Sequence, residues 1–242
     1  MFMRFIILFL VCISVHAQQI DVIVSASAGG PNDIVTRKTI EILEKNTNYQ
    51  FVVINKPGAA HTIAYNYMLT ATKPTLLFST PEITNHEVFT RLDDLFTLGY
   101  FTNDIYVSKK SGMNNLKDLY NLSKTREVIF GHGGVGSYSH KAMETMCKSQ
   151  IRCLPIPYKS GAEGMLALMS DQIDTYAVVS YSRAQYSEND KLKYIHSIKT
   201  DISDNWFKVF SKNLSNEDNI AITKALKSID GSFFKSMGFQ KK

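Results

Sequence analysis

Hydrophobic and polar positions alternate along the chain with two different periods, and segments with one period alternate with segments with the other from one end of the chain to the other. Short runs of β-branched and apolar residues, typical of strands, are followed by segments whose apolar residues return on one face of a helix. Residues 20–25 show the first strand pattern, and residues 32–45 show the first helical pattern, with Ile34, Val35 and Ile42 on one face. This alternation predicts an α/β fold with mainly parallel sheets.

The same alternation continues to the end of the chain. Further strands are predicted at residues 51–54, 75–79, 105–108, 128–130, 154–157, 173–179, 192–198 and 206–210. Further helices are predicted to begin near Thr62 and Ser139 and to cover residues 116–122, 160–169 and 216–229. Ser160 and Glu163 form a capping-box pattern, which marks the start of the helix at 160–169. No repeat or long linker interrupts the series, so two lobes would be joined by short crossings.

The N-terminal segment has a different pattern. Arg4 precedes an apolar run at residues 5–15, which is followed by the small residue Ala17 and then Gln18. A basic start, a short apolar stretch and a small residue at its end are typical of a cleaved secretory signal peptide. A membrane anchor is the alternative, but the run is shorter than the roughly 20 residues that cross a bilayer. We therefore predict cleavage of residues 1–17 and export to the periplasm.

Composition and charge narrow the class of protein. Of the 242 residues, 44% are hydrophobic and 20% are charged, which excludes a disordered, collagen-like or polytopic membrane chain. The net charge of +5 is spread thinly, and the concentrated basic face of a nucleic-acid-binding protein is missing. A mild basic bias suits an anionic ligand.

Cleavage of the signal peptide would remove Cys12 and leave two cysteines, Cys147 and Cys153. In an oxidising compartment these two cysteines could form a disulfide, one at the end of a helix and the other at the start of a strand. In a reducing compartment they would be buried as small hydrophobic residues. Neither interpretation makes them catalytic.

Two glycine-rich loops have the same arrangement: each follows a predicted strand and leads into a predicted helix. They are residues 25–33 (SASAGGPND) and residues 131–140 (GHGGVGSYSH). Glycines let backbone N–H groups approach an anion, and the start of a helix adds unpaired donors and a partial positive charge. Glycines in a single such loop could simply permit a tight turn. Two such loops in one chain favour binding of a carboxylate or a phosphate.

Two further loops connect a strand to a helix. Residues 55–61 (NKPGAAH) form the third loop, and residues 157–161 (PYKSG) form the fourth. Ligands of open α/β sheets bind beyond the carboxyl ends of the strands, where all four loops should lie. We therefore predict one binding cleft at which the four loops converge, to which Tyr176 and Tyr181 could add aromatic side chains.

Other kinds of site fit the sequence less well. The glycines of residues 131–136 match a dinucleotide fingerprint, but Pro157, Tyr158 and Lys159 stand where an acidic residue should end the next strand. No Walker A lysine, Gly-x-Ser-x-Gly elbow or His-Glu-x-x-His motif occurs. We expect no cofactor and no metal.

A secreted hydrolase is the alternative from another class of protein. Ser137 or Ser139 would act as nucleophile and His140 as base on a small ester or phosphate. A metal site is also not indicated: His132 lies in the same loop as His140, but no third metal ligand is in register with these two histidines. No acidic residue is placed to orient the His140 imidazole, and capping of the helix is the simpler role for one of the serines.

Read together and in order, the four loops resemble those of the Bug-type solute-binding receptors of tripartite tricarboxylate transporters. The Ala-Gly-Gly-x-x-Asp loop of that family is matched by residues 28–33, and its Asn-x-Pro-Gly-Ala segment by residues 55–59. Its Gly-x-Gly-Ser-x-x-His pattern is similar to residues 134–140, its Pro-Tyr-Lys-Gly/Ser segment to residues 157–160, and its Gly-Gln-x-Asp turn to residues 171–174. The likeness extends from about residue 18 to residue 230.

The resemblance implies a two-lobed Venus-flytrap fold, in which each lobe is a mainly parallel sheet flanked by helices. Residues 18–103 and 200–242 would form lobe 1, and residues 104–199 would form lobe 2. The implied ligand-binding residues of lobe 1 are Ala28, Gly29, Gly30, Asp33, Pro57, Gly58 and Ala59, joined by position by Ser79 and Thr80. Those of lobe 2 are Gly136, Ser137, His140, Tyr158 and Lys159, joined by position by Val179 and Ser180.

The resemblance also implies a role. Such a receptor captures a small carboxylate between its lobes and delivers it to membrane transporter subunits, without catalysis. We expect a monomer. Two family elements are absent, one before the third strand, where residues 73–76 stand, and one between Thr200 and Trp206. Most of the last long helix beyond Gly238 is absent as well, which leaves a receptor that senses or sequesters its ligand as a second alternative.

Overall fold

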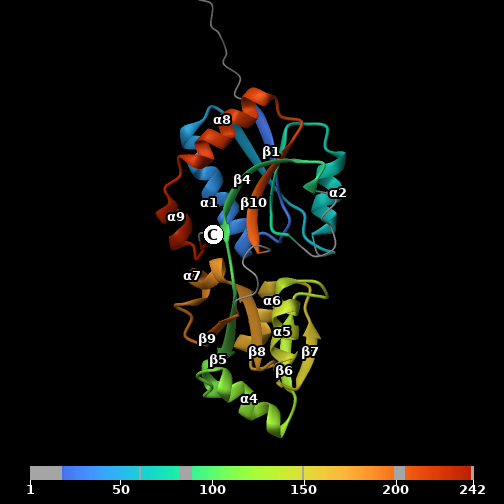
Figure 1. The fold of residues 1–242 in the computed structure, drawn as a ribbon, viewed down its shortest axis with the longest axis vertical. Helices are drawn as coiled ribbons and strands as arrows, with labels where there is room; N and C mark the ends of the chain where they lie inside the picture. Colours follow the sequence, from blue (N-terminus) through green and yellow to red (C-terminus); the bar gives the residue numbers. More distant parts are fainter. Residues whose placement is uncertain (1–17, 60, 82–88, 149, 199–204, 241–242) are drawn as a thin grey trace, which may run out of the picture.

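The computed structural model describes residues 18–59, 61–81, 89–148, 150–198 and 205–240. These residues form two lobes, each built on a five-stranded sheet (Figure 1). We call the lobe with strand order β2-β1-β3-β10-β4 the first lobe, and the lobe with strand order β7-β6-β8-β5-β9 the second lobe. The predicted signal peptide lies outside the described residues.

The first lobe combines parallel and antiparallel strands. Its parallel strands are β1 (Gln19–Val24), β2 (Gln50–Asn55) and β3 (Thr75–Ser79). Strand β10 (Trp206–Lys212) runs antiparallel between β3 and β4 (Asp93–Tyr100). The helices of this lobe are α1 (Pro31–Asn46), α2 (Thr62–Thr70), α8 (Asn216–Lys227) and α9 (Gly231–Ser236).

The second lobe repeats this plan. Strands β6 (Val128–His132), β7 (Cys153–Pro157) and β8 (Thr175–Val179) are parallel, whereas β5 (Asn103–Ser108) is antiparallel to both β8 and β9 (Leu192–Ile198). The helices of this lobe are α4 (Leu116–Thr125), α5 (Tyr138–Lys148), α6 (Gly161–Met169) and α7 (Arg183–Tyr186). Two short 3₁₀ helices, η1 (Lys109–Ser111) and η2 (Ser180–Ser182), follow β5 and β8.

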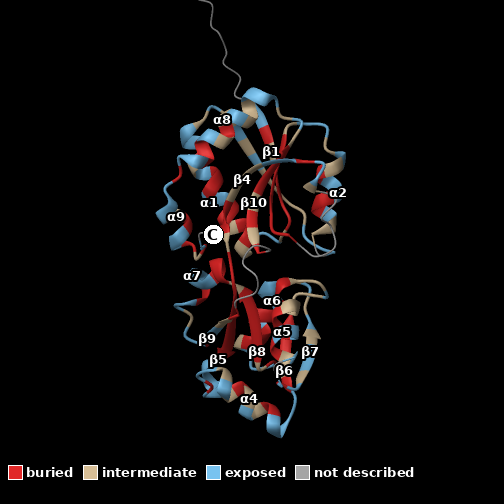
Figure 2. Ribbon diagram, in the orientation of Figure 1, coloured by how far each residue is buried: buried red, intermediate tan, exposed pale blue. Residues whose placement is uncertain are grey.

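Both faces of each sheet are covered, which explains the continuous apolar runs in the strands. In the first lobe, Val22 packs in the cluster that includes α1 and α8, whereas the next residue, Ile23, packs in the cluster that includes α2. In the second lobe, Phe130 packs with α4 and α5, and Tyr176 packs with α6. Figure 2 shows the buried strands between helices whose outer faces are exposed.

The α/β class, the two-lobed fold and the mainly parallel direction of the strands are confirmed. Each sheet is nevertheless mixed, because β10 in the first lobe and β5 in the second lobe run antiparallel to both of their neighbours. Strand β8 begins at Thr175 rather than at residue 173, because the preceding residues form a turn in which Asp171 has a φ of 57°. Strand β4 and helix α9 were not predicted, since β4 is only partly buried and α9 is too short to show a period.

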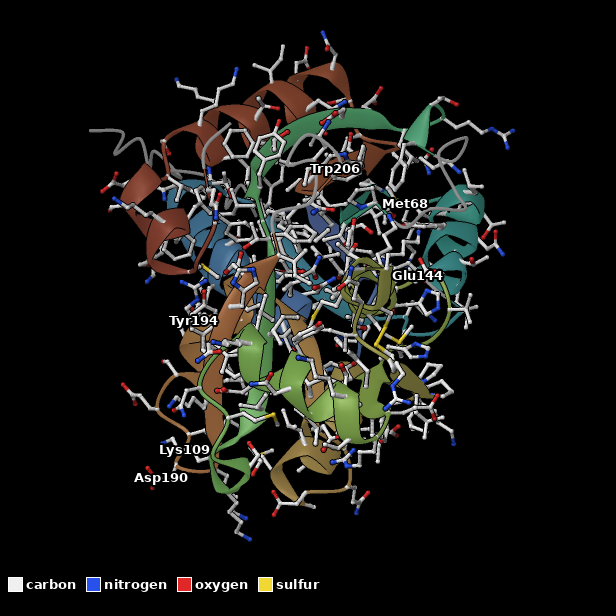
Figure 3. All side chains as sticks on the ribbon, turned by 60° about the horizontal axis from the view of Figure 1, so that its bottom comes forward. Met68, Lys109, Glu144, Asp190, Tyr194 and Trp206 are labelled. Carbon is white, nitrogen blue, oxygen red and sulfur yellow. A yellow bond between two sulfur atoms is a disulfide. The ribbon has the colours of Figure 1, made fainter. Side chains whose placement is uncertain are left out.

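Cys147 and Cys153 form a disulfide with a sulfur–sulfur distance of 2.06 Å. The bond joins the end of α5 to the start of β7, and Figure 3 shows it as a yellow bond. Of the two alternatives that the sequence left open, the structure therefore has the disulfide. None of the helices in the described ranges is long and apolar enough to span a membrane.

Candidate functional site

A cavity of about 260 Å³ lies between the two lobes and is lined by both of them. All four loops singled out in the sequence reach it, because each follows the carboxyl end of a parallel strand, namely β1, β2, β6 or β7. The first lobe contributes residues 25–28, 30–32 and 57–59, with His61 and Thr80. The second lobe contributes Gly133, residues 137–139, 159–162 and 176–179, with Tyr181 and Tyr186.

Four helices point their N-termini at this cavity. The lining includes Pro31, the first residue of α1, and His61, which precedes α2. It also includes Tyr138 and Gly161, the first residues of α5 and α6. The start of a helix carries a partial positive charge and unpaired N–H groups. The cavity therefore offers an anion a positive potential that comes from the backbone.

Unpaired amides at these helix starts follow from the hydrogen-bond pattern. The first intrahelical bond of α1 runs from Ile34 N to Gly30 O at 3.0 Å, so the amide of Asn32 has no helical partner. The first bond of α6 runs from Gly164 N to Ser160 O at 3.2 Å, which leaves the amide of Gly161 in the same position. Such donors bind a carboxylate or phosphate oxygen well.

Charged side chains contribute little to this potential. Among the described residues that line the cavity, Lys159 is the one with a formal charge at neutral pH. Burial lowers the pKa of His61 to about 4, although a hydrogen bond to the Thr80 backbone opposes this shift, so its imidazole is neutral at pH 7. A ligand held here would be recognised mainly by dipoles and hydrogen bonds.

Asp33 stabilises the first loop from a position outside the cavity lining. Asp33 is 2% exposed, and its carboxylate accepts hydrogen bonds from Gly29 N at 2.8 Å, Arg37 Nε at 2.9 Å and Asn55 Nδ2 at 2.9 Å. Asn55 Nδ2 also donates to Ala26 O at 3.0 Å. Burial alone would raise the pKa of Asp33, but the hydrogen bonds from Arg37, Gly29 and Asn55 outweigh it and leave the pKa below its ordinary value.

A buried hydroxyl network forms the floor of the first-lobe side. Ser25 Oγ lies 3.1 Å from His61 Nδ1 and 3.1 Å from Ser79 Oγ. Tyr65 OH lies 3.1 Å from Ser79 Oγ and donates to Thr80 O at 2.9 Å. The network positions Ser25, His61 and Thr80 in the lining and keeps Ser79 behind them.

Two serines organise the second loop. Ser137 Oγ accepts from His140 N at 3.2 Å and so caps α5, as the sequence suggested for one of the serines. Ser139 Oγ accepts from Gly133 N at 2.8 Å and lies 3.0 Å from Ser137 Oγ. In the part of the chain that the structure describes, no hydrogen bond joins either serine to the His140 ring, whose Nδ1 lies 4.0 Å from Glu144. This arrangement lacks the contact that a nucleophile and its base require.

Tyr176 fills the space beneath the second and fourth loops. A Cβ atom added to Gly164 would lie 2.1 Å from its ring, and one added to Gly131 would lie 2.8 Å from it. Glycine at these two positions therefore lets the ring reach the cavity. Burial raises the pKa of Tyr176 to about 12, so its hydroxyl remains a donor at neutral pH.

The structure brings most of the predicted site residues together. Those in the lining are Ala28, Gly30, Pro57, Gly58, Ala59, Thr80, Ser137, Lys159 and Val179. Those outside it are Gly29, Asp33, Ser79, Gly136, His140, Tyr158 and Ser180. Gly29 and Gly136 have positive φ angles and shape their turns, and Tyr158 packs with the core of the second lobe. The ring of His140 lies 4.8 Å from that of His132, which also lies outside the lining.

Several lining residues were missed by the sequence-based prediction. Ser25 ends a predicted strand, and Asn32 and Tyr138 begin predicted helices, so their positions beside the glycine loops were available as a signal. Tyr186 belongs to α7, a helix that the pattern did not predict. Tyr176 and Tyr181, which the sequence offered as aromatic candidates, both line the cavity.

Two α/β lobes with a ligand-sized cavity between them define the class of periplasmic solute-binding proteins. The sequence model described as "Tripartite tricarboxylate transporter family receptor" matches residues 35–212. The chain belongs to this family of receptors.

Two UPF0065 proteins are similar in sequence. The one from Bordetella pertussis is 25% identical over 182 residues, which cover 69% of this chain and 56% of the relative. The one from Bordetella bronchiseptica is 28% identical over 171 residues, which cover 65% of this chain and 51% of the relative. The matches thus span about half the length of these relatives.

Solved structures share the fold. The periplasmic binding protein BugD is 20% identical with a TM-score of 0.73, and the match covers 91% of this chain and 85% of BugD. An R. palustris protein solved with adipate is 15% identical with a TM-score of 0.80, covering 93% of this chain and 88% of that one. The protein MatC from Rhodopseudomonas palustris, solved with malate, is 15% identical with a TM-score of 0.73, covering 91% and 89%.

Proposed function

We propose that this chain is an exported receptor that captures a small carboxylate between its lobes and presents it to membrane transporter subunits. The observation that carries the proposal is the convergence of four helix N-termini, two from each lobe, on one cavity. A molecule with a negative charge at each end would meet two helix starts on either side. The adipate and malate in similar structures are dicarboxylates of this kind.

Export is part of the proposal. The basic start, apolar run and small residue at positions 4–17 support cleavage and transport across the inner membrane. The disulfide between Cys147 and Cys153 supports an oxidising compartment such as the periplasm. The mature protein would act as a monomer, without a cofactor and without nucleic acid.

Ligand capture would proceed by closure of two lobes. We assign residues 18–103 and 200–242 to lobe 1 and residues 104–199 to lobe 2. A ligand that touches both lobes only when they are closed shifts the population toward the closed form. Transporter subunits would then distinguish the closed from the open form.

Native mass spectrometry of gently purified protein, followed by titration calorimetry with succinate, malate, adipate and citrate, tests the proposal. We expect a retained small acid, and binding of at least one of the four. Lys159→Gln should weaken binding about tenfold, because it removes a charge-assisted hydrogen-bond donor from the cavity. Lys124→Gln is the matched control, since Lys124 lies over the ring of Tyr120 on α4, outside the lining.

The proposal is refuted if the protein retains no acid and binds none of the four. Equal binding by Lys159→Gln, Lys124→Gln and the wild type would contradict the role given to Lys159. Hydrolysis of a small ester or phosphate that is lost in His140→Ala would support the hydrolase instead.

A further inference from the structure

We propose that Tyr181 is a positioning residue for the first anion-binding loop, and that the C-terminal segment at residues 238–240 holds Tyr181 in place. The tyrosine acts through Asn32, at the start of α1. This inference rests on the proposed function, because its readout is the binding of a carboxylate.

Tyr181 reaches across the junction between the lobes. It belongs to η2 of the second lobe, whereas Asn32 is the second residue of α1 in the first lobe. The Tyr181 hydroxyl donates to Asn32 Oδ1 at 2.5 Å, and the two residues are 5% and 8% exposed. Both residues line the cavity.

This hydrogen bond matters because of what Asn32 could otherwise present to a ligand. A carboxamide has an acceptor oxygen at one end and a donor NH₂ group at the other, and an anion is repelled by the first and bound by the second. Since the Tyr181 hydroxyl engages the oxygen, the acceptor end of Asn32 is not the end left for an anion. The same contact fixes the position of the residue whose backbone amide has no helical partner.

The Tyr181 ring is held by aromatic residues of the first lobe and of the crossing between the lobes. It stacks on Phe239 with the ring centroids 4.8 Å apart and the planes at 17°. Phe101 and Phe207 meet it edge-on, with centroid distances of 5.2 Å and 5.5 Å. Tyr181 accordingly packs in the core cluster of the first lobe, although its backbone belongs to the second.

The C-terminal segment that carries Phe239 is close-packed on both sides. A Cβ atom added to Gly238 would lie 2.5 Å from Ser180 O and 3.0 Å from Tyr181 Cα, both of which are backbone atoms. Gly238 O accepts from Ser180 Oγ at 3.0 Å. On the other side, Gln240 and Tyr100 exchange backbone hydrogen bonds of 3.0 and 2.8 Å. The segment therefore presses η2, and with it Tyr181, toward the start of α1.

Calorimetric titration with adipate and with malate tests this proposal. Tyr181→Phe keeps the ring and removes the hydroxyl, so we expect binding to weaken about five- to tenfold. Asn32→Ala should weaken binding by at least as much. Because the hydroxyl acts through Asn32, the double variant should bind like Asn32→Ala alone, whereas two independent structural effects would multiply.

The C-terminal segment is tested in the same assay. Gly238 has a φ of +88° and no room for a side chain. Gly238→Ala should therefore displace Tyr181 and weaken binding. When it is combined with Tyr181→Phe, we expect no further loss of binding. Gly112→Ala is the matched control, because Gly112 has a φ of +70° but open space around it. If Gly238→Ala does not fold, Phe239→Leu removes the stacked ring instead and should give the same loss.

A control for the hydroxyl is Tyr194→Phe. Tyr194, labelled in Figure 3, is 42% exposed, and its hydroxyl lies 3.2 Å from Ser197 Oγ within the second lobe. The proposal is overturned if Tyr181→Phe binds as the wild type does, or if the losses of Tyr181→Phe and Asn32→Ala multiply in the double variant. If the wild type binds no acid, the proposed function is refuted. If the wild type binds an acid but Tyr181→Phe binds it equally well, only the role of Tyr181 is refuted.

Discussion

At the scale of single residues, Asp33 shows how a motif residue can serve a binding loop without facing the ligand. The motif placed it in the site, but its carboxylate points at Gly29, Arg37 and Asn55 rather than into the cavity. It closes the loop at residues 25–33, whose other residues apart from Gly29 line the cavity. A buried carboxylate with this many donors is stabilised as the anion.

We predict that Asp33→Asn lowers the free energy of unfolding at pH 7 by about 2 kcal/mol, because it replaces a charge-assisted acceptor with an amide. The lowered pKa of Asp33 means that its stabilisation is fully present above the ordinary aspartate value of 3.8 and is lost as the pH falls through the folded-state pKa. The difference between variant and wild type should therefore shrink as the pH falls below that value. Urea unfolding at pH 7 and at acid pH measures it.

Asp190→Asn is the control for this prediction, since Asp190 is exposed on the second lobe. Its free energy of unfolding should stay within about 0.5 kcal/mol of the wild type at pH 7. Equal effects of the two substitutions, or a difference that grows toward acid pH, would contradict the role assigned to Asp33.

At the scale of single residues, the sequence predicted the loops of the site but not the contacts between the lobes. Ala28, Gly30 and Lys159 were named from local motifs, and each lies in the lining. Asn32 was not named although it lies in the first glycine-rich loop, and its contact with Tyr181, 149 positions away in the sequence, could not be predicted. A single sequence carries no periodic or motif signal for a contact of that kind.

At the scale of elements, the helix starts were the most predictable part of the molecule. Strand, glycine-rich loop and helix follow one another closely, so the elements around each loop could be read from the pattern. Strand β4 could not, because neither of its faces is fully buried and its side chains do not alternate clearly. The capping box of α6 was half correct, since Ser160 Oγ accepts from Glu163 N but the Glu163 carboxylate accepts from Lys159 N.

The disulfide belongs to this scale, because it ties the end of α5 to the start of β7. We predict that replacing both cysteines by serine lowers the free energy of unfolding by about 2 kcal/mol, through the entropy gained by the unfolded chain. Carboxylate binding should change less than twofold, since at 1.5 Å per residue the bond lies about 14 Å along α5 from Tyr138. Guanidinium unfolding and calorimetry measure the two quantities.

Reduction of the wild type should reproduce the loss of stability in the cysteine variant and should leave that variant unchanged. An unfolding midpoint that is the same with and without the disulfide would contradict the prediction. A large loss of binding would mean that the far end of α5 affects the position of its N-terminus.

At the scale of the whole molecule, the binding site exists only because two lobes meet. Each lobe brings two helix starts, and neither lobe alone encloses the cavity. The two-lobed fold could be expected from the order of the loops and their family resemblance. The mixed sheets could not, because local patterns do not show which way a strand runs against a neighbour that lies far away in the sequence.

The junction between the lobes also depends on the whole chain. Tyr138 and Tyr181 come from the second lobe but pack with Phe101 in the core cluster of the first. The Tyr138 hydroxyl also donates to Pro81 O. The C-terminal residues Gly238 and Phe239 pack against Ser180 and Tyr181 at this junction.

Recognition of negative charge by helix N-termini is tested most directly by a calorimetric titration of the wild-type protein. The retained acid, or adipate and malate if none is retained, is compared with the corresponding neutral amide of the same shape. We expect the acid to bind at least about 100-fold more tightly, because the amide has no charge for the four helix starts to stabilise. Equal affinity for acid and amide would contradict the central claim.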